Sequence, residues 1–384
     1  MAKRKRILFA VGSMRGGGSE RQMIGMLQHL DRTTFEPLLY LVYREGELLR
    51  EIPGDVPVFA FWDRHTLPQF RIPGQIHHWQ VQDFERVARE QRIDVICDRT
   101  FFMTMIAGPA SRRLGIPRVS FIDCDPQFDL PKTAGQFIWI KRQLLRRAYM
   151  GATKTVAVAD GVRENAIAYF RLPPDRVHTI YNMTDIERMD RLASEAEQRD
   201  DSVFRIICAG RLHEQKGYPY LIEAIDELVH RRGQTQLRLD ILGIGPEEER
   251  LRRMVRVKGL ESCVQFLGFR DNPYKLFRES HLFCLPSLYE GLPTVLLDAV
   301  ACRIPVLAAD CESGPREVLA DGKYGTLVPT RDSSEMADAI ADAIGNYDMW
   351  TGRTVIAREY LEQTFAAPVV LARVELLLNS ACIG

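Results

Sequence analysis

The chain has 384 residues, which is too many for one ordinary hydrophobic core and predicts two domains, each long enough to bury its own interior. Lys plus Arg and Asp plus Glu are balanced at 51 each, so no overall charge favours nucleic acid as a partner. The hydrophobic fraction of 46% and the charged fraction of 27% are those of an ordinary globular protein. No apolar run reaches the ~18 residues of a membrane span, so we expect any membrane role to be peripheral.

The cysteines and the first residues bear on the cellular compartment. The eight cysteines mostly lie singly inside apolar runs, with no CxxC pair and no metal-type cluster with His. We expect reduced, buried thiols in a cytoplasmic protein, without a disulfide framework or a metal site. The basic run at 2–6 is like the start of a signal peptide, but the apolar run before Gly12 is too short for one.

The first strand and the loop after it are typical of a nucleotide-binding fold. A continuous apolar strand is predicted at 6–11, followed by a glycine-rich loop at 12–18 and by helical apolar spacing over 21–30. The glycines do not fit GxGxxG, which argues against a dinucleotide site. We expect this loop to let the backbone approach a phosphate or a sugar, and a flexible surface turn is the alternative.

Strand and helix patterns then alternate up to residue 181. Strands are predicted at 36–43, 56–62, 94–97, 118–122, 155–159 and 177–181, and helices at 76–90, 104–114 and 136–150, with one more ending at Phe170. This order predicts a parallel, doubly wound sheet, whose ligands bind at the carboxyl ends of its strands. Asp123 and Asp125 lie at one such end and Asp98 at another. A turn or capping role is favoured for Asp98, and both roles stay open for Asp123.

The predicted helix at 136–150 combines basic and apolar side chains. Lys141, Arg142, Arg146 and Arg147 are interleaved with Phe137, Ile138, Trp139, Ile140, Leu144 and Leu145. Such a helix can dock on an anionic leaflet, which would place the protein peripherally on the inner face of the membrane. A solvated helix face is the commoner meaning of this pattern, and that interpretation stays open.

A change in composition marks the domain boundary. Residues 185–202 are mostly charged, and the strand and helix rhythm restarts after them. Strands are predicted at 204–209, 237–242, 263–267, 281–285, 305–308 and 324–328, and helices at 220–231, 294–302, 333–344 and 351–378. We expect an N-terminal domain at 1–184, a C-terminal domain at 185–355 and a final helix, 356–384, that packs back on the first domain. Two such halves imply a cleft between them.

The stretch 285–302 places two acids around a predicted helix start. An apolar strand is stopped by Pro286, and turn residues with Glu290 precede an apolar helix from Thr294. A helix N-terminus carries about half a positive charge and binds anions. Asp298 follows Glu290 by eight positions, which on a helix returns it to within about 80° of the same face. A solvated Glu in a turn and a surface Asp are the alternative.

Two cations lie in the loop after the strand at 204–209. Arg211 and Lys216 are flanked by Gly210 and Gly217. Arg offers a planar fork and Lys a point charge, and together they could neutralise a departing nucleotide diphosphate without a metal. For either residue alone, an exposed loop cation is the alternative interpretation.

These motifs carry a family resemblance. Gly210-Arg-Leu with Lys216-Gly217, Gly243-x-Gly-Pro246, Phe266-Leu-Gly268 and the stretch 286–302 with Glu290-Gly-Leu-Pro are similar to those of the family-four retaining glycosyltransferases. The resemblance implies the α/β fold called GT-B, in which two Rossmann-like domains face a central cleft. It also implies transfer of a sugar from a nucleotide-sugar donor with retention of configuration and without a metal.

The resemblance also assigns roles to single residues. Arg211 and Lys216 would hold the donor diphosphate, Glu290 would lie beside the donor sugar, and Asp298, in place of the usual Glu, would bind the ribose. Asp123 stands at the end of the predicted strand 118–122, where many relatives carry a His. The catalytic residues expected are Glu290, Arg211, Lys216 and Asp123. The donor-binding residues expected are Gly17, Gly18, Gly210, Arg211, Lys216, Gly268, Glu290, Gly291, Leu292, Pro293, Thr294, Val295 and Asp298.

The resemblance thus predicts a hexosyltransferase that uses a nucleotide sugar, expected to be a UDP-sugar, and no further cofactor. Its acceptor would be a saccharide, a lipid-linked or a small molecule, as in relatives that build polysaccharides. One alternative is a degenerate GT-B protein that binds a nucleotide sugar without transferring it, suggested by Asp298 and Asp123. A nucleotide-binding oxidoreductase is a second alternative, which the missing GxGxxG disfavours.

Overall fold

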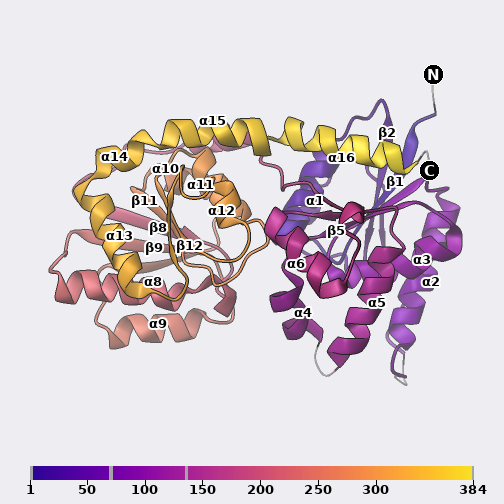
Figure 1. Ribbon diagram of the computed structural model, residues 1–384, viewed down its shortest axis with the longest axis horizontal. Helices are drawn as coiled ribbons and strands as arrows, with labels where there is room; N and C mark the ends of the chain where they lie inside the picture. The colour runs from indigo at the N-terminus through magenta and orange to yellow at the C-terminus, as the bar shows by residue number, and fades with distance from the viewer. Residues whose placement is uncertain (1–2, 69–71, 135–136, 383–384) are drawn as a thin grey trace. The chain divides into compact units, whose positions relative to one another are not determined.

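The structure is a computed structural model that describes residues 3–68, 72–134 and 137–382 (Figure 1). Contacts between Cα atoms divide the chain into two compact units. Unit 1 comprises Met1–Met183 and Ala367–Gly384, and unit 2 comprises Thr184–Ala366. Each unit is built on a parallel sheet flanked by helices, which confirms the predicted α/β class with two Rossmann-like domains.

The return of the chain to unit 1 falls at Ala367, whereas the sequence placed it at 356. Helix α15 (Thr354–Phe365) belongs to unit 2 because it packs against α11 (Thr294–Ala301). Within the same unit, the Arg358 guanidinium donates to both carboxylate oxygens of Asp190, at 3.0 and 2.7 Å. Of the residues predicted to form the final helix, only those of α16 (Ala367–Ala381) belong to unit 1.

Unit 1 contains a seven-stranded parallel sheet in the order β3-β2-β1-β4-β5-β6-β7. Its strands are β1 (Lys5–Val11), β2 (Phe35–Leu41), β3 (Val58–Ala60), β4 (Val95–Asp98), β5 (Arg118–Ile122), β6 (Lys154–Ala157) and β7 (Val177–Thr179). The central strands are almost wholly buried, as expected for a parallel sheet that is covered on both faces. They correspond to the continuous apolar runs that the sequence predicted.

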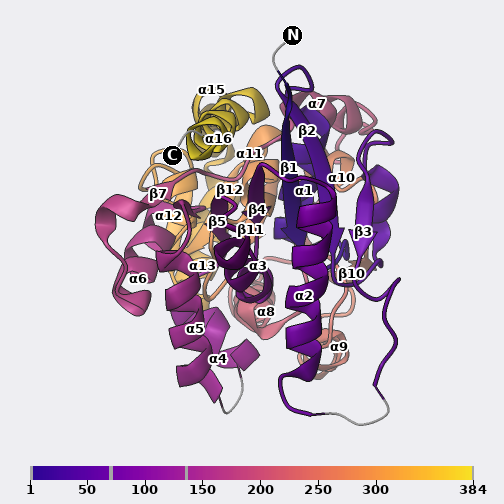
Figure 2. The ribbon, with the colours of Figure 1, turned by 90° about the vertical axis from the view of Figure 1, so that its right-hand side faces the viewer.

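The helices of unit 1 connect these strands. They are α1 (Gly18–His29), α2 (Gln75–Glu90), α3 (Phe101–Leu114), α4 (Pro126–Ala134), α5 (Ile138–Met150), α6 (Asp160–Phe170) and the returning α16. Helix α3 packs between α2 and α5 (Figure 2), and α1 packs against α16. The helix predicted from 136 begins at Ile138 in the structure, and Gln136 lies outside the described residues. Helix α4 was not predicted, because its two prolines disguise its pattern.

Unit 2 contains a six-stranded parallel sheet in the order β10-β9-β8-β11-β12-β13. Its strands are β8 (Phe204–Ala209), β9 (Leu237–Leu242), β10 (Val264–Gly268), β11 (Leu282–Leu285), β12 (Val306–Asp310) and β13 (Thr326–Pro329). Its helices are α7 (Ile186–Ala193), α8 (Tyr218–Asp226), α9 (Glu248–Val257), α10 (Tyr274–Arg278), α11, α12 (Pro315–Val318), α13 (Ser333–Gly345), α14 (Tyr347–Gly352) and α15. One core cluster fills the space between the sheet and helices α8, α9 and α13.

The charged stretch 185–202, whose composition was used to predict the domain boundary, contains helix α7. Asp185 caps this helix, because its side chain accepts a hydrogen bond from the backbone N–H of Arg188. Met189 and Ala193 are buried and lie four residues apart on one face, while the charges occupy the other. Composition alone concealed this helix, because only one narrow stripe of it is apolar.

In both sheets the strand order reverses beside the first strand of the unit. In unit 1 this point lies between β1 and β4, and in unit 2 it lies between β8 and β11, which pair through Ile206 with Leu282 and Ile207 with Phe283. Open α/β sheets bind their ligands outside the carboxyl ends of the strands at such a point. In unit 2, the loops that leave this point are 210–217 and 286–293.

No helix among the described residues is both long and apolar enough to cross a bilayer. The eight cysteines are free thiols, and six of them are buried. Burial, together with the nearby Asp298 carboxylate, raises the pKa of Cys302 to about 12. A thiol held protonated in this way is chemically inert at neutral pH.

Asp98 is part of a buried polar network in unit 1. Its carboxylate accepts hydrogen bonds from Arg118 Nη1 at 2.8 Å, Thr104 Oγ1 at 2.7 Å and Ser120 Oγ at 2.8 Å. Both charged side chains are at most 1% exposed, and Arg118 also donates to the carbonyl of Ala148. The network joins β4, β5, α3 and α5. Asp98 is therefore structural, but through a buried ion pair and not through the turn or capping role that the sequence favoured.

Replacing Asp98 by Ala should destabilise unit 1 by about 3–5 kcal/mol, because Arg118 is left as a buried charge without its partner. The lower stability of unit 1 should appear as faster hydrogen exchange of the β4 and β5 amides, measured by mass spectrometry under native conditions. Asp175→Ala, at an exposed position of the same unit, is the control and should leave this exchange unchanged. Equal exchange in both variants would contradict a structural role for the network.

Candidate functional site

Glu290 lies in the loop between β11 and α11. Its side chain is only 7% exposed, and a carboxylate buried to this extent needs a charged or hydrogen-bonding partner. Because α11 begins at Thr294, Glu290 is not part of the helix. The helical angle predicted between Glu290 and Asp298 therefore does not apply. Asp298 lies within α11 and is half-buried.

The partner of Glu290 is Lys216. The Lys216 ammonium lies 2.6 Å from Glu290 Oε1, and the Lys216 side chain is 16% exposed. The sequence assigned these residues to one ligand but did not predict that they contact each other. The contact neutralises both charges and holds the Glu290 carboxylate in one place.

The loop 210–217 packs tightly on the loop 286–293. Gly217 has a φ of +61°, and a Cβ atom there would lie 2.0 Å from the carbonyl oxygen of Pro286. Gln215 adds two hydrogen bonds: its side chain donates to the carbonyl of Tyr289 at 2.9 Å, and its own carbonyl accepts from the N–H of Leu288 at 2.8 Å. The two loops that leave the switch point of the sheet thus form one rigid structure.

A third segment, which follows β12, supports the Glu290 backbone. The Ser313 hydroxyl donates to the carbonyl of Glu290 at 2.8 Å. Gly314 has a φ of +92°, and a Cβ atom there would lie 2.5 Å from the carbonyl oxygen of Gly291. No role was predicted for these residues, because Ser-Gly-Pro after a strand has the appearance of an ordinary turn. The buried Ser287 hydroxyl was also missed, and it has no hydrogen-bond partner among the described residues.

Positive charge remains at this edge of the sheet. Arg211 is exposed, and within the described part of the chain its side chain forms no ion pair. Helix α11 begins after Pro293 without a side-chain cap, so the first N–H groups of the helix, those of Thr294 and Val295, have no intrahelical acceptor. An uncapped helix start and an unpaired guanidinium both favour an anion.

Glycines occupy the ends of the neighbouring strands, so no side chains project from these positions. Gly210 has a φ of +150°, and a Cβ atom on the adjacent Gly243 would lie 2.0 Å from the Gly210 carbonyl oxygen. The Gly243 N–H donates to the carbonyl of Gly268, which has a φ of +69°, at 2.8 Å. Gly210 and Gly268 thus lie at the same edge of the sheet as the Lys216 loop, and they leave room in front of it.

In unit 1, the candidate residues lie at the corresponding edge of the first sheet. Gly17 is the N-cap residue of α1, and Gly18 is its first residue, with no side chain capping the helix. Asp123, just after β5, accepts hydrogen bonds from Arg99 through Oδ1, at 2.9 Å from Nε. Its other oxygen, Oδ2, is buried and has no hydrogen-bond partner among the described residues. Arg99 also donates to Asn182 at 2.9 Å.

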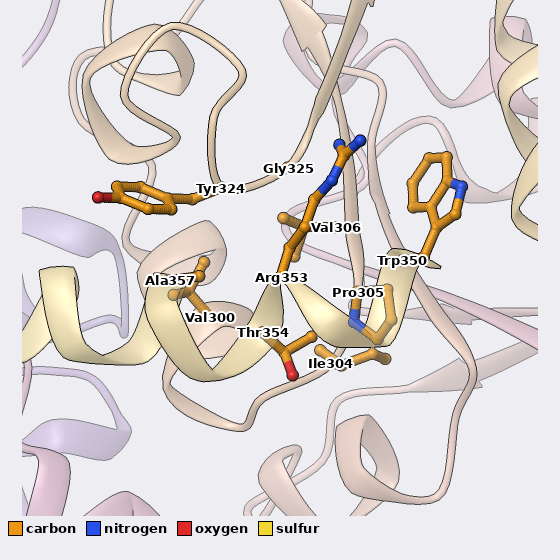
Figure 3. A pocket seen from close by; sticks show the side chains of 10 residues that line it. All are labelled: Val300, Ile304, Pro305, Val306, Tyr324, Gly325, Trp350, Arg353, Thr354 and Ala357. Atoms are coloured by element: carbon orange, nitrogen blue, oxygen red, sulfur yellow. The ribbon is translucent and has the colours of Figure 1, made fainter. Parts of the chain in front are cut away.

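A small internal space of unit 2 is not this site. It lies between α11, β12 and the start of α15, where Val300, Val306 and Thr354 are among its lining residues (Figure 3). Its volume of about 10 Å³ is enough for one water molecule at most. Among the described residues, no group of three or more His, Cys, Asp and Glu side chains is placed to hold a metal ion.

Comparison with known proteins identifies the family. Residues 203–346 match the model of the glycosyl transferases group 1, and residues 16–188 match that of the glycosyltransferase family 4. The chain is 30% identical to the alpha-D-kanosaminyltransferase of Streptomyces kanamyceticus over 279 residues, which cover 68% of this chain and 70% of that protein. The chain belongs to the family 4, group 1 glycosyltransferases.

Other relatives of this glycosyltransferase match over shorter segments. It is 30% identical over 197 residues to the N-acetylgalactosamine-N,N'-diacetylbacillosaminyl-diphospho-undecaprenol 4-alpha-N-acetylgalactosaminyltransferase of Campylobacter jejuni. That match covers 51% of this chain and 52% of the relative. A match to an uncharacterized glycosyltransferase of Methanocaldococcus jannaschii covers 43% of that protein, so the chain spans about half the length of each of these two relatives.

Solved structures share the fold of this glycosyltransferase. HepE of Anabaena, in complex with UDP and glucose, matches with a TM-score of 0.81 at 22% identity, covering 98% of this chain and 100% of that one. The sucrose-phosphate synthase of Thermosynechococcus elongatus matches with a TM-score of 0.79 at 15% identity, covering 98% and 99%. These likenesses show that the fold is GT-B.

Gly217→Ala should lower the thermal stability of the glycosyltransferase and weaken nucleotide binding, because the new Cβ atom would overlap the Pro286 carbonyl. Gly259→Ala is a matched control in the same unit: its φ of +66° imposes the same backbone strain, but no atom lies within 4 Å of its Cβ position. The difference in melting temperature between the two variants isolates the loop contact. Equal melting temperatures would show that the two loops are not packed as described.

Proposed function

We propose that this chain transfers a sugar from a nucleotide-sugar donor, a UDP-sugar, to an acceptor hydroxyl with retention of configuration and without a metal. The observation that carries the proposal is the Lys216–Glu290 pair at the switch point of the second sheet, beside an unpaired Arg211 and an uncapped helix start. The UDP and glucose bound to HepE, a protein of the same fold, support the choice of donor.

The diphosphate of the donor would bind to the cations of this edge. Within the described part of the chain the exposed Arg211 guanidinium has no ion-pair partner, and the N–H groups of Thr294 and Val295 lie at the uncapped start of α11. Lys216 would turn one of its three N–H donors to a phosphate oxygen while another stays on Glu290. Gly210 and Gly268 would let the nucleotide lie close to the strand ends, and Asp298 would bind a ribose hydroxyl.

Glu290 would position the sugar. Lys216 occupies Oε1, which leaves Oε2 to accept a hydrogen bond from a sugar hydroxyl. The backbone of Gly291, Leu292 and Pro293 would surround the neighbouring hydroxyls. Because the Glu290 backbone is fixed by Ser313 and its carboxylate by Lys216, little rotational freedom is lost when the sugar binds.

The transfer step would proceed on one face of the sugar. The bond between the anomeric carbon and the leaving phosphate oxygen breaks, and a bond from the acceptor oxygen to the same carbon forms on the same side. The proton of the acceptor hydroxyl passes to an oxygen of the leaving diphosphate, so no protein base is needed. Arg211, Lys216 and the α11 N-terminus would stabilise the charge that develops on the diphosphate.

Gly17, Gly18 and Asp123 of unit 1 belong to the same proposal. The backbone of Gly17 and Gly18, at the uncapped start of α1, would approach the phosphates or the acceptor. Asp123 Oδ2 would accept a hydroxyl of the reacting sugar, because this buried oxygen lacks a partner while Arg99 holds the other one. Arg99 thereby holds the Asp123 carboxylate in one orientation.

A lipid-linked acceptor agrees with the surface of α5. Phe137, just before this helix, and Trp139 and Leu144 within it are 61%, 66% and 43% exposed, and Arg147 is exposed beside them. Arg142, in contrast, is engaged by the Tyr169 carbonyl at 2.9 Å. We propose that this surface contacts the anionic inner leaflet. Trp139→Ala should then release the protein from vesicles that contain anionic lipid, and unchanged sedimentation would reject the contact.

The test of the proposed function is incubation of the protein with UDP-sugars, followed by NMR. Slow release of the sugar or its transfer to a saccharide, with the anomeric configuration of the donor retained in the first product, is expected. Nucleotide-sugar binding without any release would instead establish the alternative of a degenerate, non-transferring protein. An inverted product would contradict the front-face reaction.

Arg211→Ala and Lys216→Ala should each lower turnover at least about a hundredfold, because each removes a charge that stabilises the leaving diphosphate. The fold should persist, as judged by circular dichroism. Arg253→Ala is the control: this exposed arginine of the same unit forms only a surface pair with Glu249 at 3.7 Å. Near-native turnover of both loop variants would contradict the proposed phosphate contacts.

A further inference from the structure

A surface pocket of unit 1 takes no part in the chemistry proposed above. It has a volume of about 310 Å³ and is lined by His65, Trp79, Gln82, Asp83 and Arg86. This volume is at the lower end of the range for small-molecule pockets and suits one sugar ring with its substituents. Four of the residues share one face of α2, because their spacing of three and four positions matches the helical repeat.

Asp83 fixes the floor of this pocket. Its side chain is fully buried, and it accepts hydrogen bonds from Tyr40 Oη at 3.0 Å, Arg64 Nη2 at 2.7 Å and Arg86 Nη2 at 2.6 Å, with His65 Nε2 at 3.2 Å. Burial alone would raise the pKa of Asp83, but the hydrogen bond from Arg86 and the charge of Arg64 outweigh it and lower the pKa. The carboxylate is therefore ionised and holds both guanidinium groups in place.

The Arg86 guanidinium of this pocket is only partly engaged. Arg64 and Arg86 share the single charge of Asp83, and the Arg86 side chain remains 48% exposed. One Nη of Arg86 is used by Asp83, and among the described residues no other acceptor is bonded to its guanidinium. The hydrogen bond to Asp83 raises the pKa of Arg86, and the charge of Glu90, an exposed residue further along α2, adds to this effect. The free side of the Arg86 fork matches a ligand carboxylate.

Three aromatic rings, those of Phe61, His65 and Trp79, form an aromatic wall in the same region as Arg86. The His65 ring stacks on Phe61 at 4.5 Å between centroids and faces Trp79 at 6.5 Å, with an interplanar angle of 28°. The electron-rich face of an indole attracts the C–H face of a pyranose ring. The exposed Gln82 amide supplies one donor group and one acceptor for ring hydroxyls.

We propose that this pocket binds an acidic sugar unit of the acceptor saccharide, with the sugar carboxylate on Arg86 and the ring against Trp79. The proposal rests on the proposed transferase function, since it names the class of acceptor that the enzyme extends. A neutral sugar would leave the charge of Arg86 unused, and an inorganic anion would leave the aromatic wall unused. Only a ligand that carries both features uses the whole pocket.

Ligand-observed NMR titrations of the full chain with D-glucuronate, D-glucose and inorganic phosphate test the proposal. Glucuronate should bind at least about tenfold more tightly than glucose or phosphate, the ratio that a charge-assisted hydrogen bond supplies. Equal affinities for glucuronate and glucose, or tighter binding of phosphate than of glucuronate, would overturn the proposal.

Two variants assign the binding to this pocket. Arg86→Gln should remove the preference for glucuronate over glucose, whereas Trp79→Ala should weaken both sugars. Arg89→Gln, at an exposed position on the same helix, is the matched control and should retain the wild-type preference. Loss of the preference in Arg89→Gln as well, at an unchanged melting temperature, would show nonspecific charge attraction and refute the assignment.

A parallel thermal-shift measurement with UDP separates this proposal from the proposed function. Stabilisation by UDP without any glucuronate binding would refute the acidic-sugar pocket and leave the transferase proposal standing. Glucuronate binding without any nucleotide binding would support the pocket and contradict the transferase proposal. Because the wild-type protein is used in both measurements, misfolding of a variant cannot imitate either result.

Discussion

The close approach of Gly217 to the Pro286 carbonyl oxygen is the constraint on which the site of unit 2 depends. A Cβ atom would need the space 2.0 Å from that oxygen, so only glycine lets the loops after β8 and β11 meet. Their meeting brings together two side chains that are 74 positions apart in the sequence, Lys216 and Glu290. A parallel sheet places these loops side by side at its switch point, and glycine lets them touch there. The backbone contact between the two loops therefore determines where the charged side chains of the site lie.

The Lys216–Glu290 pair explains how a strongly charged site remains stable when it is empty. Two largely buried charges at 2.6 Å satisfy each other, whereas either one alone would carry a large desolvation cost. In the proposed reaction an incoming diphosphate would share Lys216 with the carboxylate, and Arg211 and the start of α11 would add attraction for the anionic ligand. The site would thus take up the diphosphate beside the carboxylate, and it would need little rearrangement when the donor binds.

Much of the fold could be predicted from the sequence, because buried parallel strands are continuous apolar runs. The predicted bounds of β8 and β9 match the structure, as do those of β5. Helix α7 was missed because its many charges hide a narrow apolar stripe. The residues around the candidate site could be singled out from glycine and charge patterns, but their contacts could not. The pairing of Lys216 with Glu290, the support of Glu290 by Ser313 and the hold of Arg99 on Asp123 all depend on how separate loops pack, and no local pattern encodes that.

The most direct measurement of the central claim is the affinity for UDP, by calorimetry, of the wild type, Lys216→Met, Glu290→Gln and the double variant. If Glu290 and the diphosphate share the charge of Lys216, Glu290→Gln should strengthen UDP binding in the wild-type background and have no effect when Lys216 is absent. Such non-additivity is the signature of a shared interaction. An effect of Glu290→Gln that is the same in both backgrounds would contradict the claim that Lys216 joins the sugar-binding carboxylate to the phosphate site.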